Sequence, residues 1–236
     1  MIGLIMLSQL LSAQVAEVRK VHDQGFTTIV PNEGQWEGPH YNRAELGFGN
    51  LFTDDKGYKI TLWNGQQMWN LMHEFHQYKN LKTTQVIDYC ALHFNFLDGN
   101  TNQIPEYIVP ASWKEGYYLD NDPAQWAPKV QPYYQMTKKN VYPGIHFQHS
   151  TLGNYAKSEW HIQPKARASQ IKISIVGADS IRIISGELIV YTPVGNLIEK
   201  APEAWQIRNQ VKWPIQVGYK LNGNTLSFEI GEYDQN

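Results

Sequence analysis

The second half of the chain is the feature that most constrains the fold. About ten short runs rich in Val, Ile, Thr, Tyr and Trp follow one another there, separated by Gly, Pro and Asn. This pattern is typical of short strands joined by tight turns. Several runs alternate, as where Ile171, Ile173 and Ile175 flank Lys172 and Ser174, which suits a sheet with one buried face. The sequence therefore predicts an all-β, antiparallel, β-sandwich-like fold.

We expect two packed β subdomains, one over residues 14–135 with aromatic-rich loops and one over residues 136–236. In the first, Tyr41 to Phe52 and Tyr58 to Trp63 are expected to be strands, with Asp54 to Gly57 as a hairpin connection. In the second, strands are expected over residues 158–162, 171–175, 180–184, 187–191, 204–207, 215–219 and 225–229.

One segment has a different period. Apolar residues recur at spacings of three and four between residues 66 and 82, which predicts one short helix there. The residues concerned are Met68, Trp69, Leu71, Met72, Phe75 and Tyr78. Residues 99–133 show no clean period, and we expect irregular structure packed by its own aromatic side chains.

The first 13 residues have the form of a signal peptide. An apolar run from Gly3 ends in the small residues Ser12 and Ala13, just before Gln14. No Lys or Arg precedes the run, so a hydrophobic strand or helix of the mature fold is the alternative. The run is shorter than the roughly 20 apolar residues of a membrane-spanning helix, so we expect no transmembrane segment. The predicted location is extracellular, either secreted or on the bacterial cell surface.

Composition narrows the class of protein. Aromatic residues make up 13% and charged residues 18% of the chain, which favours a folded core over disorder. The formal net charge is −2, so nothing attracts the chain as a whole to nucleic acid. The sole cysteine, Cys90, excludes an intramolecular disulfide, and its apolar surroundings indicate a small buried hydrophobe.

Several short motifs, in order and spacing, resemble a known family. In the first part they are Asn32-Glu33-Gly34-Gln35-Trp36, Asp120-Asn121-Asp122-Pro123 with Trp126 and Val130, and Asn140-Val141-Tyr142-Pro143-Gly144-Ile145. In the second they are Glu159-Trp160-His161-Ile162 with Pro164, Gly186-Glu187-Leu188 with Thr192-Pro193-Val194-Gly195, Glu199, and Pro202-Glu203-Ala204-Trp205-Gln206.

The family that these motifs resemble is the N-terminal, all-β domain of unknown function in large secreted bacterial surface proteins. Those proteins often continue into SBBP-type β-propeller repeats and end in gliding-motility-associated or secretion-sorting domains. Two departures stand out: His146 occupies a position where the family usually has Asp, and the strand that usually follows Tyr233-Asp234 is missing. The resemblance implies location and architecture more than mechanism, because no enzymatic role is established for the family. We expect no cofactor.

Ionisable residues offer only weak chemical patterns. His73 and His76 are three apart, whereas the metalloprotease motif needs a spacing of four and a third ligand. His146, His149 and His161 would need folding to bring them together, and in an extended strand His149 points away from His146. We predict no metal site and no catalytic residue.

Three carboxylates permit a rival hypothesis. Glu115, Asp120 and Asp122 lie close in sequence and could serve as a glycosidase carboxylate pair or as an oxygen-rich calcium loop. The favoured interpretation is that they hydrogen-bond their own backbone in turns ahead of Pro123.

Exposed tryptophan and tyrosine rings are a common means of stacking on sugars or anchoring partners. The candidate ligand-binding residues are the loop aromatics Trp113, Tyr117, Tyr118 and Trp126. We predict a non-enzymatic module that acts in interaction, adhesion or display, linked to gliding or surface attachment. Its expected partners are extracellular polysaccharide or other surface proteins. The alternatives are a carbohydrate-binding module, which predicts a coplanar aromatic strip, and a glycoside hydrolase-type enzyme.

Overall fold

The computed structural model describes residues 2–6, 27–78, 86–119, 121–123, 126–152 and 155–234. Its first elements are strands β1 (Ile2–Met6), β2 (Ile29–Pro31), β3 (His40–Leu46), β4 (Gly49–Asp54) and β5 (Gly57–Trp63), then helix α1 (Gly65–Tyr78). Strands β6 (Tyr89–Phe96), β7 (Glu106–Pro110), β8 (Glu115–Tyr117), β9 (Ala127–Val130), β10 (Tyr133–Tyr142), β11 (Ile145–Leu152) and β12 (Tyr155–Ile162) follow.

A short 3-10 turn, η3 (Ala168–Gln170), leads into the last part of the chain. This part consists of β13 (Ile173–Val176), β14 (Ser180–Ile184), β15 (Glu187–Thr192), β16 (Gly195–Glu199), β17 (Glu203–Arg208), β18 (Val211–Ile215), β19 (Val217–Asn222) and β20 (Thr225–Ile230). The regular structure of the described residues is therefore mostly antiparallel β, with one α-helix, which confirms the predicted all-β fold class.

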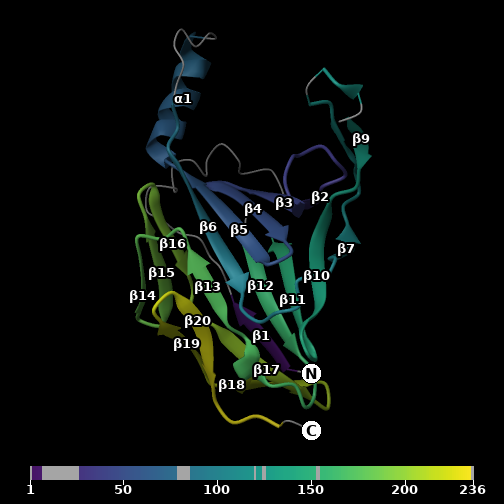
Figure 1. The fold of residues 1–236 in the computed structure, drawn as a ribbon, viewed down its shortest axis with the longest axis vertical. Helices are drawn as coiled ribbons and strands as arrows, with labels where there is room; N and C mark the ends of the chain where they lie inside the picture. Colours follow the sequence, from purple (N-terminus) through teal and green to yellow (C-terminus); the bar gives the residue numbers. More distant parts are fainter. Residues whose placement is uncertain are drawn as a thin grey trace.

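Most strands belong to one large curled sheet (Figure 1). Its 15 strands run in the order β18-β17-β1-β12-β11-β10-β2-β3-β4-β5-β6-β13-β20-β19, with β7 paired to β10 off this path. The strand pairings among the described residues are antiparallel, for example Phe147 with Trp160 between β11 and β12. Two smaller sheets, β14-β15-β16 and β8-β9, complete the fold.

One apolar core fills the concave side of the curled sheet. It includes Ile29 and Leu92 from the first half of the chain and Phe147, Ile173 and Leu226 from the second. Core residues alternate along many of the strands, as Ile173 and Ile175 do in β13, because successive side chains point to opposite faces. The boundary expected between residues 135 and 136 lies inside β10, so both predicted subdomains supply strands to the same sheet.

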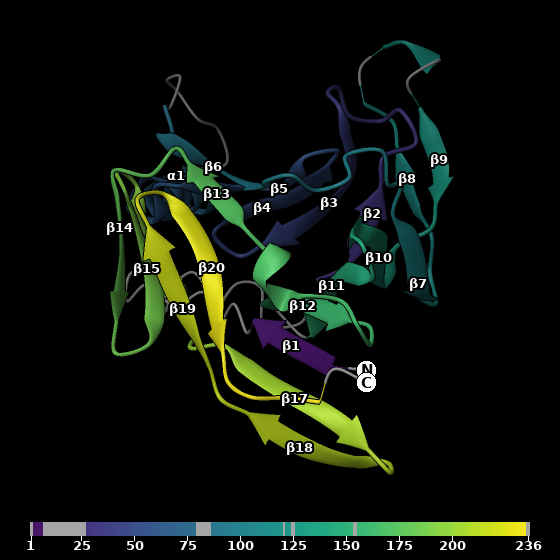
Figure 2. The same ribbon diagram turned by 60° about the horizontal axis from the view of Figure 1, so that its bottom comes forward.

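Strand β1 comes from the segment with the form of a signal peptide. Its backbone lies between β12 and β17 and pairs with both (Figure 2). Cleavage after residue 13 stays a prediction. The structure describes no helix that is long and apolar enough to cross a membrane.

Helix α1 covers most of the segment for which a helix was expected, and residues 79–82 of that prediction lie outside the described residues. It begins where the Asn64 side chain accepts a hydrogen bond from the Gln67 amide at 3.1 Å, a typical N-cap. Its apolar stripe is only partly covered: Met68 and Met72 are half-buried, while Trp69 and Phe75 are exposed. Helix α1 and the β8–β9 hairpin both extend from the end of the molecule opposite the termini (Figure 1).

Candidate functional site

The four predicted ligand-binding residues all lie on one projection, which we call the aromatic arm (residues 113–130). It is built on the two-stranded sheet β8–β9, in which Tyr117 pairs with Ala127. Val30, Ala127 and Val130 form a small second core at its base, and Trp36 and Tyr117 pack against that core. The arm therefore has an apolar anchor of its own, separate from the main core.

A carboxylate lies between two of the aromatic residues of the arm. Glu115 Oε1 accepts a hydrogen bond from the Trp113 indole at 3.2 Å, and Glu115 Oε2 accepts one from the Tyr117 hydroxyl at 2.5 Å. Burial, together with this bond to a carboxylate, raises the pKa of Tyr117 well above its ordinary value. Glu115 thus holds the two rings in fixed positions.

The exposed rings of the arm meet edge to face. Tyr118 and Trp126 lie 5.5 Å apart between ring centroids at an interplanar angle of 76°, and Trp113 meets Tyr134 at 82°. Tyr118 is 62% exposed and Trp126 41%, whereas Tyr117 is half-buried against Trp36 at 74°. The structure therefore brings the predicted residues onto one arm but does not arrange them as a coplanar strip.

Exposed apolar side chains concentrate in and just before the arm. Seven of the 17 exposed large hydrophobic residues described lie between residues 104 and 126. They are Ile104, Ile108, Val109, Trp113, Tyr118, Leu119 and Trp126. Of this set, Trp113, Tyr118, Leu119 and Trp126 lie on the arm itself, and exposed apolar side chains that gather on one surface are typical of an interaction site.

The carboxylates of the hydrolase hypothesis are only partly placed. Asp120 lies outside the described residues, Asp122 is exposed beside Pro123, and Glu115 makes the two hydrogen bonds given above.

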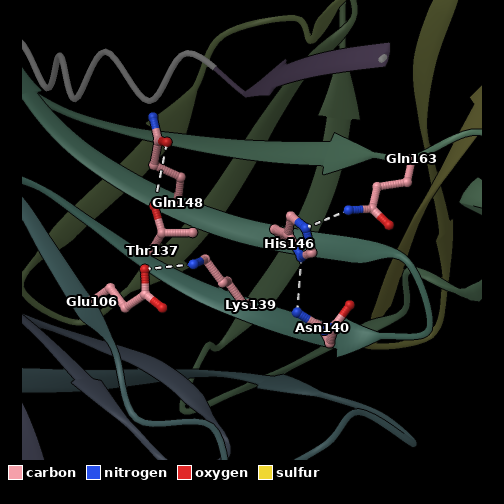
Figure 3. Close-up of polar contacts among 7 residues, drawn as sticks. All are labelled: Glu106, Thr137, Lys139, Asn140, His146, Gln148 and Gln163. Carbon is pink, nitrogen blue, oxygen red and sulfur yellow. Dashed lines mark hydrogen bonds and ion pairs between the residues drawn. The ribbon is translucent and has the colours of Figure 1, made fainter.

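The structure separates most of the predicted histidines but brings two of them together, because His146 of β11 is the register partner of His161 of β12. His146 and Gln148 lie on one face of the sheet (Figure 3), whereas His149 is buried on the other, as the alternation of a strand requires. His73 stacks on Trp69 of α1 at 5.1 Å, and the side chain of His76 lies outside the described residues. Among the described residues, no group of three or more His, Cys, Asp or Glu side chains is placed to hold a metal ion.

The polar face drawn in Figure 3 holds His146 in a network of neutral partners. His146 Nδ1 accepts a hydrogen bond from the Asn140 amide at 2.9 Å, so the neutral ring carries its proton on Nε2. The side-chain amide of Gln163 lies 3.0 Å from His146 Nε2. With its oxygen turned toward the ring, this amide accepts a hydrogen bond from the Nε2 proton. Burial and the nearby Lys139, which is ion-paired with Glu106 at 2.7 Å, lower the pKa of His146.

A comparison with known families assigns the chain. The profile described as "Domain of unknown function (DUF7948)" matches residues 29–236. The chain belongs to the DUF7948 family. The match spans the aromatic arm and nearly the whole sheet, and the family description names no activity, ligand or partner. No curated protein and no solved structure matches the chain.

Sequence reasoning missed a buried polar cluster in the DUF7948 fold. Glu199 and Tyr58 are almost fully buried in the main core, and Tyr219 is 7% exposed beside them. Burial raises the pKa of Glu199 to about 7, against a smaller opposing effect of the hydrogen bond with Tyr219. The Tyr219 hydroxyl also donates to the Lys200 carbonyl at 3.0 Å. In the sequence, the one indication of this buried carboxyl was that Glu199 directly follows the apolar residues Leu197 and Ile198.

A groove on the β17–β18 hairpin was also missed. It has a volume of about 410 Å³, and Lys212 Nζ lies 3.3 Å from the centroid of the Trp205 ring at its wall. It is lined by Pro202, Glu203, Ala204, Trp205, Lys212, Pro214, Ile215, Gln216 and Val217. A ring and an ammonium in this contact attract each other. The eight tryptophans of the chain gave no way to single out Trp205 in advance.

Proposed function

We propose that this DUF7948 chain is a non-enzymatic module of a secreted or cell-surface bacterial protein, and that it acts in interaction, adhesion or display through its aromatic arm. The observation that carries the proposal is the set of exposed rings at Trp113, Tyr118 and Trp126 on one anchored projection. The extracellular location rests on the form of residues 1–13.

Contact between these apolar rings and water is unfavourable, and a partner that covered the rings would remove that contact. Tryptophan and tyrosine side chains bury a large apolar area, and they dominate the energetics of many interfaces. The arm holds its rings in place through Glu115 and the small core at its base, so binding would order few additional side chains. These features support a preorganised contact surface.

The edge-to-face geometry favours a protein partner over a flat sugar surface. Because Tyr118 and Trp126 meet at 76°, only one ring at a time can lie parallel to a sugar ring. A partner with projecting apolar or basic side chains, as on another surface protein, can contact both a ring face and a ring edge.

Carbohydrate binding is the second candidate, since Trp113 and Trp126 are each about two-fifths exposed and could stack singly on sugars. A glycoside hydrolase-type activity is a third. It would require two carboxylates about 5 to 9.5 Å apart across a cleft, and Glu115 and Asp122 are the described candidates.

Binding of the fluorescently labelled full chain to bacterial cells and to an array of glycans and envelope polysaccharides tests the proposal. The Trp113→Ala, Trp126→Ala double variant should lose at least tenfold in cell binding, because each truncation at a hot spot costs about 2 kcal/mol or more. Trp69→Ala on α1 is the matched control, since Trp69 is 40% exposed but lies away from the arm, and it should bind as the unchanged chain does.

Three outcomes separate the candidates. Cell binding that depends on the arm, without glycan binding, supports the surface-protein module. Glycan binding that disappears in the double variant moves the assignment to the carbohydrate-binding alternative. Cell binding that is absent, or equal in all three proteins, contradicts the proposal.

A further inference from the structure

In the part of the chain that the structure describes, the backbone pairing of β1 joins two parts of the large sheet. In the strand order it separates β17–β18 from β12 and all the strands beyond it. Leu4 pairs with Trp160 of β12 on one side and with Ala204 of β17 on the other. We call this position between β12 and β17 the strand slot. Figure 2 shows β1 lying in it.

The neighbours of the slot define what it takes. Positions 2 and 4 lie in register between inward-facing, buried residues: Ile162 and Gln206 at position 2, and Trp160 and Ala204 at position 4. Position 5 lies between Glu159 and Glu203 on the opposite face. An occupant therefore needs apolar residues at the two core-facing positions and a neutral or basic residue between the carboxylates.

An empty slot would leave two strands without a partner. Both β12 and β17 run antiparallel to β1, so they are parallel to each other. Direct pairing between them would require a different pattern of backbone hydrogen bonds. Each would present unpaired amides and carbonyls beside the core, and the β17–β18 hairpin would lose its connection to the sheet. The fold therefore requires a strand at this position.

The other end of the chain lies at the mouth of this slot. The Gln206 side chain donates to the Asp234 carbonyl at 2.5 Å and accepts from the Asp234 amide at 3.2 Å. Gln206 is also the register partner of Ile2, so Asp234 lies at the end of the slot where β1 begins. A strand that entered here would run toward Glu203, in the same direction as β1 and antiparallel to both neighbours.

We propose that the strand slot is an acceptor site for an apolar strand that enters from the Asp234 end of the chain and replaces residues 2–6. The biological use of the site rests on the proposed function, because removal of residues 1–13 during export would vacate the slot. Addition of a strand to open sheet edges is a recurring mode of recognition, in which backbone hydrogen bonds provide affinity and alternate side chains provide specificity.

Strand transplantation within the full chain tests this site. Leu4→Pro removes one backbone donor from β1 and places proline in a central strand, where it is poorly tolerated. This variant should unfold at a lower denaturant concentration, and the slot-facing amides of β12 and β17 should exchange at least tenfold faster. Addition of the sequence Ile-Gly-Leu-Ile-Met after Asn236, through a short Gly-Ser linker, should restore both quantities in a monomeric protein.

The control is the same C-terminal addition with proline at its third position, which should restore nothing. Equal midpoints for the unchanged chain and Leu4→Pro would overturn the proposal, as would an addition that restores no more than its proline control. Restoration that occurs only with dimerisation would also overturn it, because the strand would then come from a second copy.

This experiment measures the denaturant midpoint of the chain and the hydrogen exchange of the amides that face the strand slot, with no ligand present. The proposed function is tested by binding at the aromatic arm, at the opposite end of the molecule (Figure 1). Either proposal can therefore fail while the other stands.

Discussion

At the scale of single residues, Glu199 is a carboxyl group buried among the apolar side chains of the main core. Its carboxyl is 1% exposed, and Oε2 has no hydrogen-bond partner among the described residues. Burial raises the pKa of Glu199 from 4.5 to about 7. Between these two values the folded chain binds more protons at Glu199 than the unfolded chain does. The free energy of unfolding therefore falls as the pH rises through this window.

Glu199→Gln should remove this pH dependence, because the amide keeps the shape of the protonated acid and carries no charge. Near pH 5 the variant should be about as stable as the unchanged chain. At pH 8 it should be more stable by about 1 to 3 kcal/mol, since each pKa unit corresponds to about 1.4 kcal/mol. Denaturant unfolding at both pH values measures the difference. Two proteins with parallel pH–stability curves would contradict the assignment.

Val109 occupies a conformation that its side chain disfavours. Its φ is +59°, in the left-handed region, although it is β-branched and half-exposed on β7. A residue held there costs about 1 to 2 kcal/mol.

Val109→Asn should raise the free energy of unfolding by about 1 kcal/mol, because asparagine tolerates positive φ and the side chain is 50% exposed. Ile104→Asn, at an exposed apolar residue without positive φ, is the matched control and should have little effect. Chemical denaturation of the three proteins measures both changes. A Val109→Asn variant no more stable than the control would show that the strain is absent.

At the scale of elements, helix α1 depends on its own sequence more than on the core. Trp69 is 40% and Phe75 54% exposed, so packing contributes little to the helix. Its N-cap is the Asn64 side chain. Asn64→Ala should destabilise α1 by about 1 kcal/mol, the usual contribution of such a cap.

Strands β5 and β6 pair directly with each other, and helix α1 lies outside the sheet. We therefore expect Asn64→Ala to destabilise the helix without destabilising the sheet. Amides of α1 should exchange about fivefold faster, while the amides of β5 and β6 keep their protection. Gln66→Ala, on the exposed side of the first turn, serves as the control. Equal loss of protection throughout the sheet would mean that α1 is part of the global folding unit.

Elements with strong local signals were predictable. The hairpin connection at Asp54 to Gly57 is present, where Asp54 accepts hydrogen bonds from the amides of Lys56 and Gly57. The run Tyr41 to Phe52, expected as one strand, is divided into β3 and β4 by a turn at Gly47 and Phe48. Gly49 ends that turn so close to β5 that a Cβ would lie 1.6 Å from the Thr61 carbonyl. This close approach depends on the neighbouring strand and is invisible in the sequence.

Two C-terminal strands were missed for reasons of composition. Strand β16 begins with Gly195 and Asn196, which are typical of turns, and β18 contains Pro214. Proline is tolerated in β18 because this strand lies at the end of the sheet order, where one side needs no partner. The arm was expected to be irregular, yet β8 and β9 pair in it, since two short strands give little periodicity.

The location of the aromatic arm was predictable because aromatic residues gather in one loop-rich segment. Its internal geometry was not, since the partners Trp36 and Tyr134 come from other parts of the chain. The polar contacts inside the core were unpredictable for the same reason. Lys138, for example, is fully buried and donates to the carbonyls of Asp54 and Asp55, more than 80 residues away.

At the scale of the whole molecule, the arrangement of the core bears on whether the chain folds as one unit or two. One core cluster includes Leu92 and Phe94 of β6 as well as Ile173 and Ile175 of β13. These strands pair directly, with Phe94 opposite Ile175. Strand β10 runs through residue 135, so no cut at that position separates two sheets.

We therefore expect a single cooperative unfolding transition for the main sheet. Far-ultraviolet circular dichroism and tryptophan fluorescence should give the same denaturant midpoint, because Trp160 is buried in this shared core. Leu92→Ala should lower that midpoint for both signals together, by about 2 to 5 kcal/mol in the free energy of unfolding. Ile173→Val, which removes one methyl group across the predicted boundary, should shift both signals by about 1 kcal/mol. Two separated transitions, each moved by only one of the substitutions, would establish two independent subdomains, and the curled sheet would then have to divide within β10.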